Sequence, residues 1–137
     1  MIVDADGAIL GRLAANVAKR LLLGEEVVVV NAEKAVITGD KKRIFRDYKE
    51  KVDRGHRYKG PFFPREPHMV LKRTVRGMLP WKSPKGREAF KRLKVHLGVP
   101  EGMDAEKLPE ISIGARGATR FVRLGEVCQF LGWRPRV

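Results

Sequence analysis

The first third of the chain alternates between short apolar runs and one amphipathic segment. Residues 1–3 and 25–31 have the length and composition of strands, and the second run contains four consecutive valines. The segment between them has apolar residues at helical spacing: Leu10, Leu13, Ala14, Val17 and Leu21. This spacing predicts a helix with one apolar face, and Gly24 follows it as a left-handed cap residue would. A strand, a helix and a strand with short links predict a layered α/β domain with parallel strands.

The rest of the chain adds further strands and helices to this pattern. The four valines are typical of a strand covered on both faces, and two more strand candidates are residues 35–38 and 94–99. A helix is expected after Asp40, a suitable N-cap, and its inner face carries Ile44, Phe45, Tyr48 and Val52. One more helix is indicated by apolar residues near the end of the chain: Leu124, Val127, Cys128 and Leu131.

Two basic helices are predicted in the middle of the chain. The first covers about residues 68–79 and is stopped by Pro80. The second begins where Ser83 can cap and Pro84 can occupy the first helical position. Each helix keeps apolar residues on one face and places cations on the other, among them Lys72, Arg73, Arg76, Arg87 and Lys91. We therefore expect a basic helical hairpin over residues 68–96.

Between the predicted helices, residues 53–67 follow no periodic pattern. They contain three prolines, two glycines, three aromatic residues and, counting His56, five basic residues. A segment of this composition cannot form its own core and is long for a passive connection. We expect it to form an extended loop that packs on the domain or orders against a partner.

Length and composition favour one domain over residues 1–137. A chain of this size can bury a real core, and 43% hydrophobic residues are too many for a disordered basic tail. No apolar run approaches the roughly 20 residues that span a bilayer, and Asp4 and Asp6 lie where a signal peptide would be basic. A single cysteine, Cys128, excludes an internal disulfide and fits a reducing cytosol.

Charge is the feature that points to a partner. The formal net charge is +13, and residues 41–96 hold 19 Lys and Arg against 5 Asp and Glu. The remaining residues hold 10 cations against 11 carboxylates, so the whole surplus lies in this one stretch. Lysine and arginine that neutralise phosphates release condensed counterions, which makes a nucleic-acid backbone the commonest partner of such a surface. We expect neither a membrane partner nor a small-molecule substrate.

The strongest local constellation lies at residues 73–87, where two helix ends flank a turn with an aromatic tip. Trp81 can stack on a base or a sugar; alternatively, it pins the turn to the core. The surrounding cations can hold phosphates, and the start of the second helix offers free N–H groups to a phosphate oxygen. The candidate RNA-binding residues here are Lys72, Arg73, Arg76, Trp81, Lys82, Lys85, Arg87 and Lys91.

The loop before the hairpin mixes cations with aromatic residues in the same way. Its candidate RNA-binding residues are Arg54, Arg57, Tyr58, Lys59 and Arg65. Tyr58 is flanked by cations and is the better candidate for stacking on a base. At least one of Phe62 and Phe63 is expected to anchor the loop to the core.

Catalytic and metal-binding patterns are weak. Residues 7–11 form a glycine-containing turn between a strand and a helix, but they lack the G-x-G-x-x-G spacing and no Walker lysine follows. His56, His68 and His96 match no metal-ligand spacing, and Cys128 lies on an apolar stripe as a small core residue would. No nucleophile with a base and no suggestive carboxylate pair can be nominated, so we expect no catalysis and no cofactor.

Three segments resemble a known family, the L-thirteen proteins of the large ribosomal subunit in their archaeal and eukaryotic form. The first is GAILGRLAANVAKRLLLG at residues 7–24, and the second is VVVNAEKAVITG at residues 28–39. The third and most specific contains VRGMLP at 75–80, GREA at 86–89 and LKVHLGVP at 93–100. Together the segments follow the family along the chain.

The resemblance implies a three-layer α/β/α fold with a four-stranded, mainly parallel sheet. It implies a non-enzymatic, structural constituent of the large subunit that binds ribosomal RNA early in assembly, next to other large-subunit proteins on cytoplasmic ribosomes. Its RNA-contacting positions would include Arg73, Arg76, Lys82, Lys85 and Arg87. The chain departs from bacterial members in the loop and after Pro100, and it ends without the long helical tail of eukaryotic relatives.

Two other hypotheses belong to different classes. One is an RNA-modifying enzyme with a Rossmann-like fold that binds a nucleotide cofactor at residues 7–11, although the sequence supplies neither a clear pocket nor an acid or base. The other is a DNA-compacting protein, for which no helix-turn-helix or basic-zipper pattern is present. The leading hypothesis remains a ribosomal scaffold that binds folded RNA.

Overall fold

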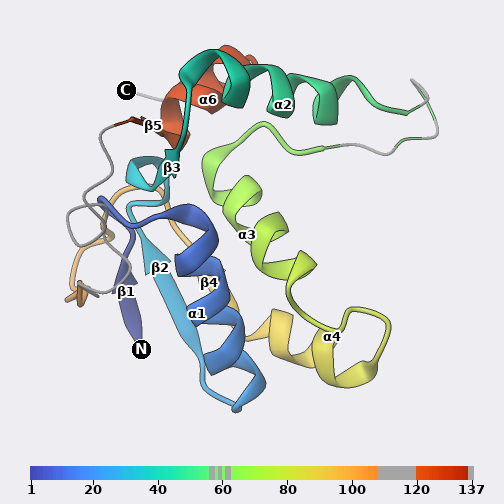
Figure 1. The fold of residues 1–137 in the computed structure, drawn as a ribbon. Helices are drawn as coiled ribbons and strands as arrows, with labels where there is room; N and C mark the ends of the chain where they lie inside the picture. Colours follow the sequence, from blue (N-terminus) through green and yellow to red (C-terminus); the bar gives the residue numbers. More distant parts are fainter. Residues whose placement is uncertain (56–57, 59, 61–62, 108–119, 136–137) are drawn as a thin grey trace.

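The computed structural model describes residues 1–55, 58, 60, 63–107 and 120–135. Figure 1 shows their helices and strands. In chain order the elements are β1 (Ile2–Asp4), α1 (Leu10–Leu22), β2 (Val27–Val30), the 3-10 helix η1 (Ala32–Lys34), β3 (Val36–Thr38), α2 (Lys41–Asp53), α3 (Pro67–Gly77), α4 (Pro84–Lys91), β4 (Leu93–Val95), β5 (Phe121–Arg123) and α6 (Leu124–Phe130). The predicted α/β class is confirmed, with a parallel sheet and five α-helices in the described part of the chain.

The parallel sheet has the order β1-β2-β4. Val3 pairs with Val29 of β2, and Val29 pairs in turn with Val95 of β4. Because side chains alternate along a strand, Val3, Val27, Val29, Leu93 and Val95 share one face of this sheet. All five are buried there.

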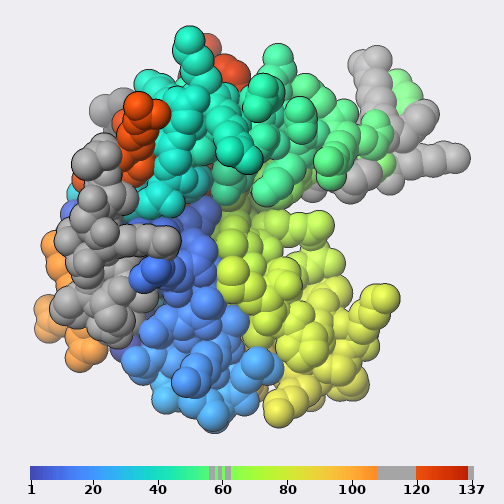
Figure 2. All heavy atoms as spheres, in the orientation of Figure 1, coloured from blue at the N-terminus to red at the C-terminus, as the bar shows by residue number. Residues whose placement is uncertain are grey.

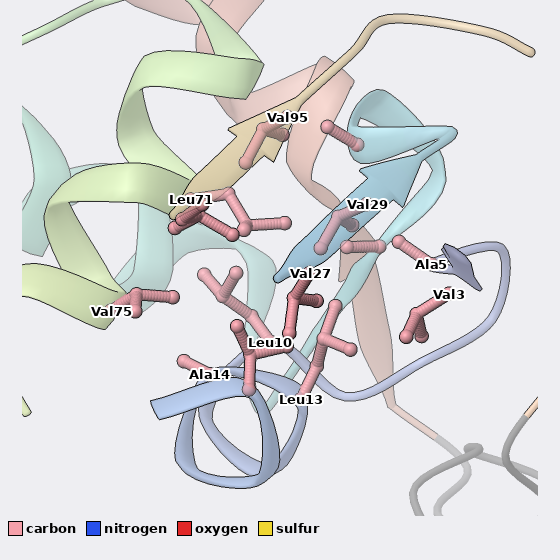
Figure 3. Packing of buried hydrophobic residues seen from close by; sticks show 14 of the residues in the cluster. Val3, Ala5, Leu10, Leu13, Ala14, Val27, Val29, Leu71, Val75 and Val95 are labelled. Carbon is pink, nitrogen blue, oxygen red and sulfur yellow. The ribbon is translucent and has the colours of Figure 1, made fainter. Parts of the chain in front are cut away.

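A layer of helices covers that face. α1 packs against α3, α4 and β2, while α3 also packs against β4. Figure 3 shows Leu10, Leu13 and Ala14 of α1 gathered with Leu71 and Val75 of α3 against the valines of the sheet. The helical periodicity of residues 10–21 therefore predicted the main core correctly.

The opposite face of the sheet is less covered than the valine run predicted. It carries Ile2, Val28 and Lys94, which are partners in register. Ile2 and Val28 are half-buried and Lys94 is exposed, so the described residues do not show a second helical layer. Val30 lies on the same face as Val28 and is fully buried. Residues 27–30 are therefore covered on both faces at the carboxyl end of β2, and only in part at Val28.

The third predicted strand, residues 35–38, does not join the parallel sheet. β3 pairs antiparallel with β5, with Ile37 opposite Val122, so the parallel sheet has three full strands in the described residues rather than four. Only five residues separate β2 from β3, and a parallel neighbour needs a crossover of a dozen or more. A single parallel bridge between Val3 and Glu106 extends the sheet beyond β1.

A second, smaller cluster of apolar residues joins α2 to α6 and β5. Its buried members are Ile44, Val122, Val127 and Leu131. The ring of Phe45 stacks on that of Phe130, with centroids 4.6 Å apart. α2 is therefore held by its own local packing at one end of the molecule (Figure 1).

Helix ends follow the predicted signals with one difference. Gly24 has φ +95° after α1, and the hydroxyl of Ser83 accepts a hydrogen bond from the N–H of Gly86 at 3.4 Å. Asp40 occupies the N-cap position of α2, but its side chain makes no capping bond. The strand predicted at 94–99 is shorter, because β4 covers Leu93–Val95 and the chain turns at Gly98, which has φ +66°.

Candidate nucleic-acid interface

The hairpin of α3 and α4 is closed by a tight contact at its turn. A Cβ atom added to Gly86 would lie 2.1 Å from the carbonyl oxygen of Pro80. Only glycine allows this approach, so the first turn of α4 sits directly on the end of the turn that follows α3. The N–H of Ser83 donates to the same Pro80 carbonyl at 3.0 Å. These two contacts fix the conformation of the turn at residues 78–83.

Trp81 is half-buried at the tip of this turn and contacts two cations. The guanidinium carbon of Arg76 lies 4.2 Å from the centroid of the indole, and the Nε of Arg87 donates to the Trp81 carbonyl at 3.0 Å. The ring of Phe90 meets the indole edge-on, with centroids 5.3 Å apart. These contacts favour the anchoring interpretation of Trp81, because Arg76 lies over its ring where a base would stack.

Lys72 extends the same arrangement along the hairpin. Its Nζ lies 5.7 Å from the centroid of Phe90, so two cations of α3 each face an aromatic ring of the turn or of α4. We call Lys72, Arg76, Trp81, Arg87 and Phe90 the hairpin cluster. Cation–π contacts of this kind restrict long side chains that would otherwise move freely in water.

The other predicted hairpin cations lie around the cluster on the surface. Arg73, Lys82, Lys85 and Lys91 are exposed, whereas Lys72 and Arg76 are half-buried. Within the described residues, none of these cations forms an ion pair with a carboxylate. The hairpin therefore presents its positive charge to solvent.

Ion pairs are found elsewhere in the described part of the chain. Arg20 lies 3.7 Å from Glu25, and Arg123 lies 2.9 Å from Asp6. The third contact joins His68 to Glu66 at 3.3 Å and is an ion pair only when the histidine is protonated. The charge surplus of residues 41–96 is thus not cancelled by internal pairing in the part that the structure places.

The loop before the hairpin is described only in part. Arg57, Lys59 and Phe62 lie outside the described residues. Arg54 and Arg65 are exposed, and Tyr58 is 76% exposed. The predicted aromatic anchor is confirmed for Phe63, which is half-buried and meets the ring of Tyr48 edge-on at 6.1 Å.

One basic residue of the hairpin has an internal role that the sequence did not indicate. The Nη2 of Arg92 donates to the carbonyl of Leu21 at 2.6 Å. This bond satisfies a carbonyl in the last turn of α1 and ties the end of α4 to that helix. Arg92 is half-buried, and its neighbours in sequence, Lys91 and Leu93, gave no sign of this contact.

N–H groups of the turn that leads into α1 are already bonded within the protein. The N–H of Asp6 donates to the Asp4 carboxylate at 2.9 Å, and that of Gly7 donates to the Lys34 carbonyl at 3.2 Å. Ala8 donates to the Ala5 carbonyl at 3.0 Å. These three N–H groups are used inside the protein, so they are not available to a phosphate.

Polar groups at the carboxyl edge of the sheet also bind one another. This edge is where open α/β sheets usually bind ligands. Here the side-chain amide of Asn31, a buried residue with φ +57°, donates to the carboxylate of Asp4 at 2.9 Å. The bond joins the ends of β1 and β2 and uses one carboxylate oxygen of Asp4 inside the protein.

The candidate catalytic and metal-binding residues remain isolated. Burial raises the pKa of the Cys128 thiol to about 12, so it is not a nucleophile at neutral pH. Burial, and then the neighbouring Cys128, raise the pKa of Tyr48 to about 12. In the described part of the chain no three His, Cys, Asp or Glu residues are grouped to hold a metal ion, and no helix there is long and apolar enough to cross a bilayer.

A cleft of about 920 Å³ lies between the start of α3 and residues 132–135. Its lining mixes charges of both signs, with Arg65 and Arg134 beside Glu33 and Glu66. Both carboxylate oxygens of Glu33 accept from the N–H of Gly98, at 3.1 and 3.2 Å. Arg65 thus lines this cleft, whose lining includes no residue of the hairpin cluster.

The space-filling view shows how the basic elements are arranged. In Figure 2 the surface is hollowed between α2 at the top and α4 at the lower right, with α3 at the back of the hollow. α2 and the hairpin are therefore the two sides of a concave face. A concave surface with cations can receive a folded, rounded polyanion.

Comparisons with known proteins place the sequence among ribosomal proteins. The family model described as ribosomal protein L13 matches residues 1–101. The large ribosomal subunit protein uL13 of Archaeoglobus fulgidus is 56% identical over 97% of this chain and 88% of its own length. The proteins of the same name from Methanosarcina barkeri and Methanopyrus kandleri are 48% and 46% identical, over 96% and 97% of this chain and 96% and 87% of their own lengths.

Proposed function

This chain belongs to the ribosomal protein L13 family, and we propose that it binds and organises large-subunit ribosomal RNA through the hairpin of α3 and α4. As a member of this family it is a structural constituent of the large ribosomal subunit and not an enzyme. Its place is the ribosome in the cytoplasm, where ribosomal RNA and other ribosomal proteins are its partners.

One observation carries the proposal most directly. Arg76 and Arg87 are both held by Trp81, at 4.2 Å from its ring and 3.0 Å from its carbonyl oxygen, and neither is paired with a carboxylate in the described residues. Holding a cation without neutralising it restricts its motion while leaving its charge available. Binding a phosphate then costs less side-chain entropy.

The mechanism is binding alone. The exposed Arg73, Lys82, Lys85 and Lys91 neutralise phosphates of closely packed RNA strands, so that the strands can approach one another. The hairpin cluster fixes the positions of these charges relative to the α/β body. Recognition rests on the shape of the RNA backbone more than on base sequence.

The loop before the hairpin supplies further contacts in this proposal. Arg54, Arg57, Lys59 and Arg65 add phosphate-binding cations, and Tyr58 stacks on an unpaired base. The anchoring of Phe63 on Tyr48 supports this role, because it fixes the loop to α2 four residues before α3 begins. Contacts with neighbouring ribosomal proteins are assigned to surfaces outside the hairpin and the loop.

The proposal also covers the domain organisation and the number of strands in the sheet. We infer that residues 1–137 act as one domain, and that the chain near Glu106 supplies the fourth strand of a three-layer fold. The support is the parallel bridge of Val3 with Glu106, in which Asp4 donates to the Glu106 carbonyl at 2.9 Å. Slow amide exchange at residues 105–107 would support a fourth strand, and rapid exchange there would contradict it.

The proposed role of the hairpin is tested by measuring the RNA affinity of variants. Arg76→Ala or Arg87→Ala is expected to weaken binding to large-subunit ribosomal RNA by about 1–3 kcal/mol, because each removes a charge-assisted contact. Arg12→Ala on the exposed side of α1 is the matched control. Affinity is measured by filter binding at several salt concentrations, and wild-type affinity of both hairpin variants at low salt would overturn the assignment.

A further inference from the structure

We propose that α2 carries a second phosphate-binding surface, formed by Lys42, Arg46 and Lys49, that contacts a different RNA segment from the one bound by the hairpin. The inference rests on the proposed function and adds to it a second, separate contact. A protein with two such surfaces fixes the distance between two parts of the RNA. We call these three residues the α2 row.

The α2 row lies on one side of its helix. Its members are four and three positions apart, so with 3.6 residues per turn they follow one another along the helix surface. The rise between them is about 6 Å and about 4.5 Å. These steps are of the order of one to two phosphates along a nucleic-acid strand, at about 3.4 Å of axis each, and all three side chains are exposed.

Among the residues that the structure describes, no carboxylate forms an ion pair with the α2 row. The helix holds six cations and three carboxylates, and Glu50 and Asp53 are four positions after Arg46 and Lys49, a spacing that permits pairing. Within the described ranges of the chain, however, no residue of α2 forms an ion pair. The three cations therefore point into solvent with their charge uncompensated.

The helix that carries the row packs on the small cluster both opposite the row and beside it: Ile44 lies on the far side of the helix, and Phe45 lies about one turn from Lys42 and Lys49. Ile44 is 7% exposed in the small cluster, and Phe45 stacks on Phe130 at 4.6 Å. Packing in this way holds the exposed side of α2 in one orientation relative to α6. The backbone beneath the row is thus supported, whereas its exposed side chains have no ring contacts in the described residues of the kind that restrain the hairpin cations.

The α2 row faces away from the segment that leads into the hairpin. Lys51 leans over the rings of Tyr48 and Phe63, with its Nζ 4.7 and 5.7 Å from their centroids. At about 100° per residue, Lys51 lies on the opposite side of the helix from Lys42 and Lys49. An RNA segment bound to the α2 row is therefore a different segment from one bound in the hollow beside α3.

The test replaces the whole row and compares two readouts. The variant Lys42→Gln/Arg46→Gln/Lys49→Gln keeps good helix formers at exposed positions, so α2 is expected to fold as before. The control Arg12→Gln/Lys19→Gln/Lys34→Gln removes the same charge from exposed positions outside α2 and the hairpin. The probe is a full-length large-subunit ribosomal RNA transcript.

The first readout is the dependence of affinity on salt. Three lost phosphate contacts are expected to reduce the slope of log K against log salt by about 2 to 3, whereas the control changes it by less than one. The second readout is hydroxyl-radical footprinting. The wild-type protein is expected to protect two separate RNA segments, of which the α2 variant loses one and keeps the segment that weakens in Arg76→Ala.

The outcomes separate this proposal from the function on which it rests. An unchanged slope and footprint in the α2 variant, together with a lost footprint in Arg76→Ala, would overturn the α2 surface and leave the hairpin in place. An equal loss in the control variant would also overturn it, because charge alone would then explain the effect. Loss of the hairpin footprint in the α2 variant would show one shared contact rather than two.

Discussion

The hairpin and α2 are both basic, but they stand on cores of very different size. The hairpin packs on the main cluster, which has 22 buried residues in the described part of the chain, most of them from α1, α3, α4, α6 and the parallel sheet. α2 packs on a second cluster with four buried residues. Elements with few buried contacts open locally at lower free energy. The difference indicates a rigid hairpin and an α2 that can adjust to its partner.

The two regions also hold their cations differently. In the hairpin, Arg76 and Lys72 lie against aromatic rings and are half-buried. On α2, Lys42, Arg46 and Lys49 are exposed without such a contact in the described residues. Restricting the hairpin cations lowers the entropy lost on binding. Two segments that are both basic can therefore differ in how far their cationic side chains are pre-organised for binding. Four predictions test this difference between the hairpin and α2.

The largest effect is expected from truncating the main core. Leu71→Ala removes a fully buried side chain of α3 and should lower the free energy of unfolding by about 2–5 kcal/mol. Leu131→Ala lies at the partly open edge of the small cluster, with 8% exposure, and should cost less. Denaturant unfolding measures both. The same loss of unfolding free energy in both variants would contradict the difference between the two cores. So would faster amide exchange outside α2 and α6 in the Leu131→Ala variant.

The next effect comes from the turn of the hairpin. Gly86→Ala places a methyl group against the Pro80 carbonyl oxygen, a backbone atom that cannot move alone, and should destabilise the protein by about 1–3 kcal/mol. Gly77→Ala is the matched control, because no atom lies within 4 Å of its added Cβ. It should be neutral or stabilise α3 by up to about 1 kcal/mol. Thermal unfolding of the two variants compares them, and the same loss in both would contradict the close approach.

A smaller effect is expected at Trp81. Trp81→Ala removes the ring beneath Arg76 and should weaken RNA binding by about 1 kcal/mol, whereas Trp81→Phe keeps an aromatic face and should lose less than half of that. The double variant Trp81→Ala/Arg76→Ala should bind no more weakly than Arg76→Ala, because Trp81 acts through Arg76. Additive losses would show a direct contact of Trp81 with the RNA.

The smallest effect at neutral pH is expected where the two apolar clusters meet, at Tyr48 of α2 and Cys128 of α6. Burial raises both pKa values to about 12, from ordinary values of 10.0 and 9.0. The unfolded chain ionises these groups at lower pH than the folded protein does. Their contribution to stability is therefore complete below about pH 9 and is lost as pH rises toward 12.

Unfolding free energies at pH 8, 9, 10 and 11 measure this loss. Cys128→Ala should show a shallower decline from pH 9 to 10 than the wild-type protein, since one ionisable group is gone. At pH 8 the native thiol should resist alkylation by iodoacetamide and react after unfolding. Rapid alkylation of the native protein at pH 8 would contradict the burial of Cys128.

The elements with strong local signals could be predicted from the sequence. The apolar stripe of α1, the Ser83 cap and the proline at the start of α4 are all local, and each is found where it was expected. The partner of β3 could not be predicted, because β5 begins 85 positions after β3 begins and carries no pairing signal of its own. Strand pairing depends on the whole fold, whereas helix periodicity depends on neighbours along the chain.

The candidate site was predictable as a region but not as a set of contacts. The clustering of cations in residues 41–96 indicated a polyanion partner, and the structure places the hairpin cations of that stretch at the surface. Composition could not separate Arg92, which binds a helix carbonyl, from Lys91, which faces solvent. Nor could it show that Arg76 covers the indole of Trp81, because that contact depends on the geometry of the turn.

The strand order β1-β2-β4 has a consequence for how the chain folds during its synthesis. The central strand β2 is complete at residue 30, but its second partner is residues 93–95. Until more than sixty further residues have left the translating ribosome, one edge of β2 has no partner strand, and unpaired edges invite wrong association. The basic hairpin is made before β4, so we expect this protein to begin meeting nucleic acid before its own sheet is closed. Pulse-labelled proteolysis of nascent chains stalled before and after residue 95 would reveal the step.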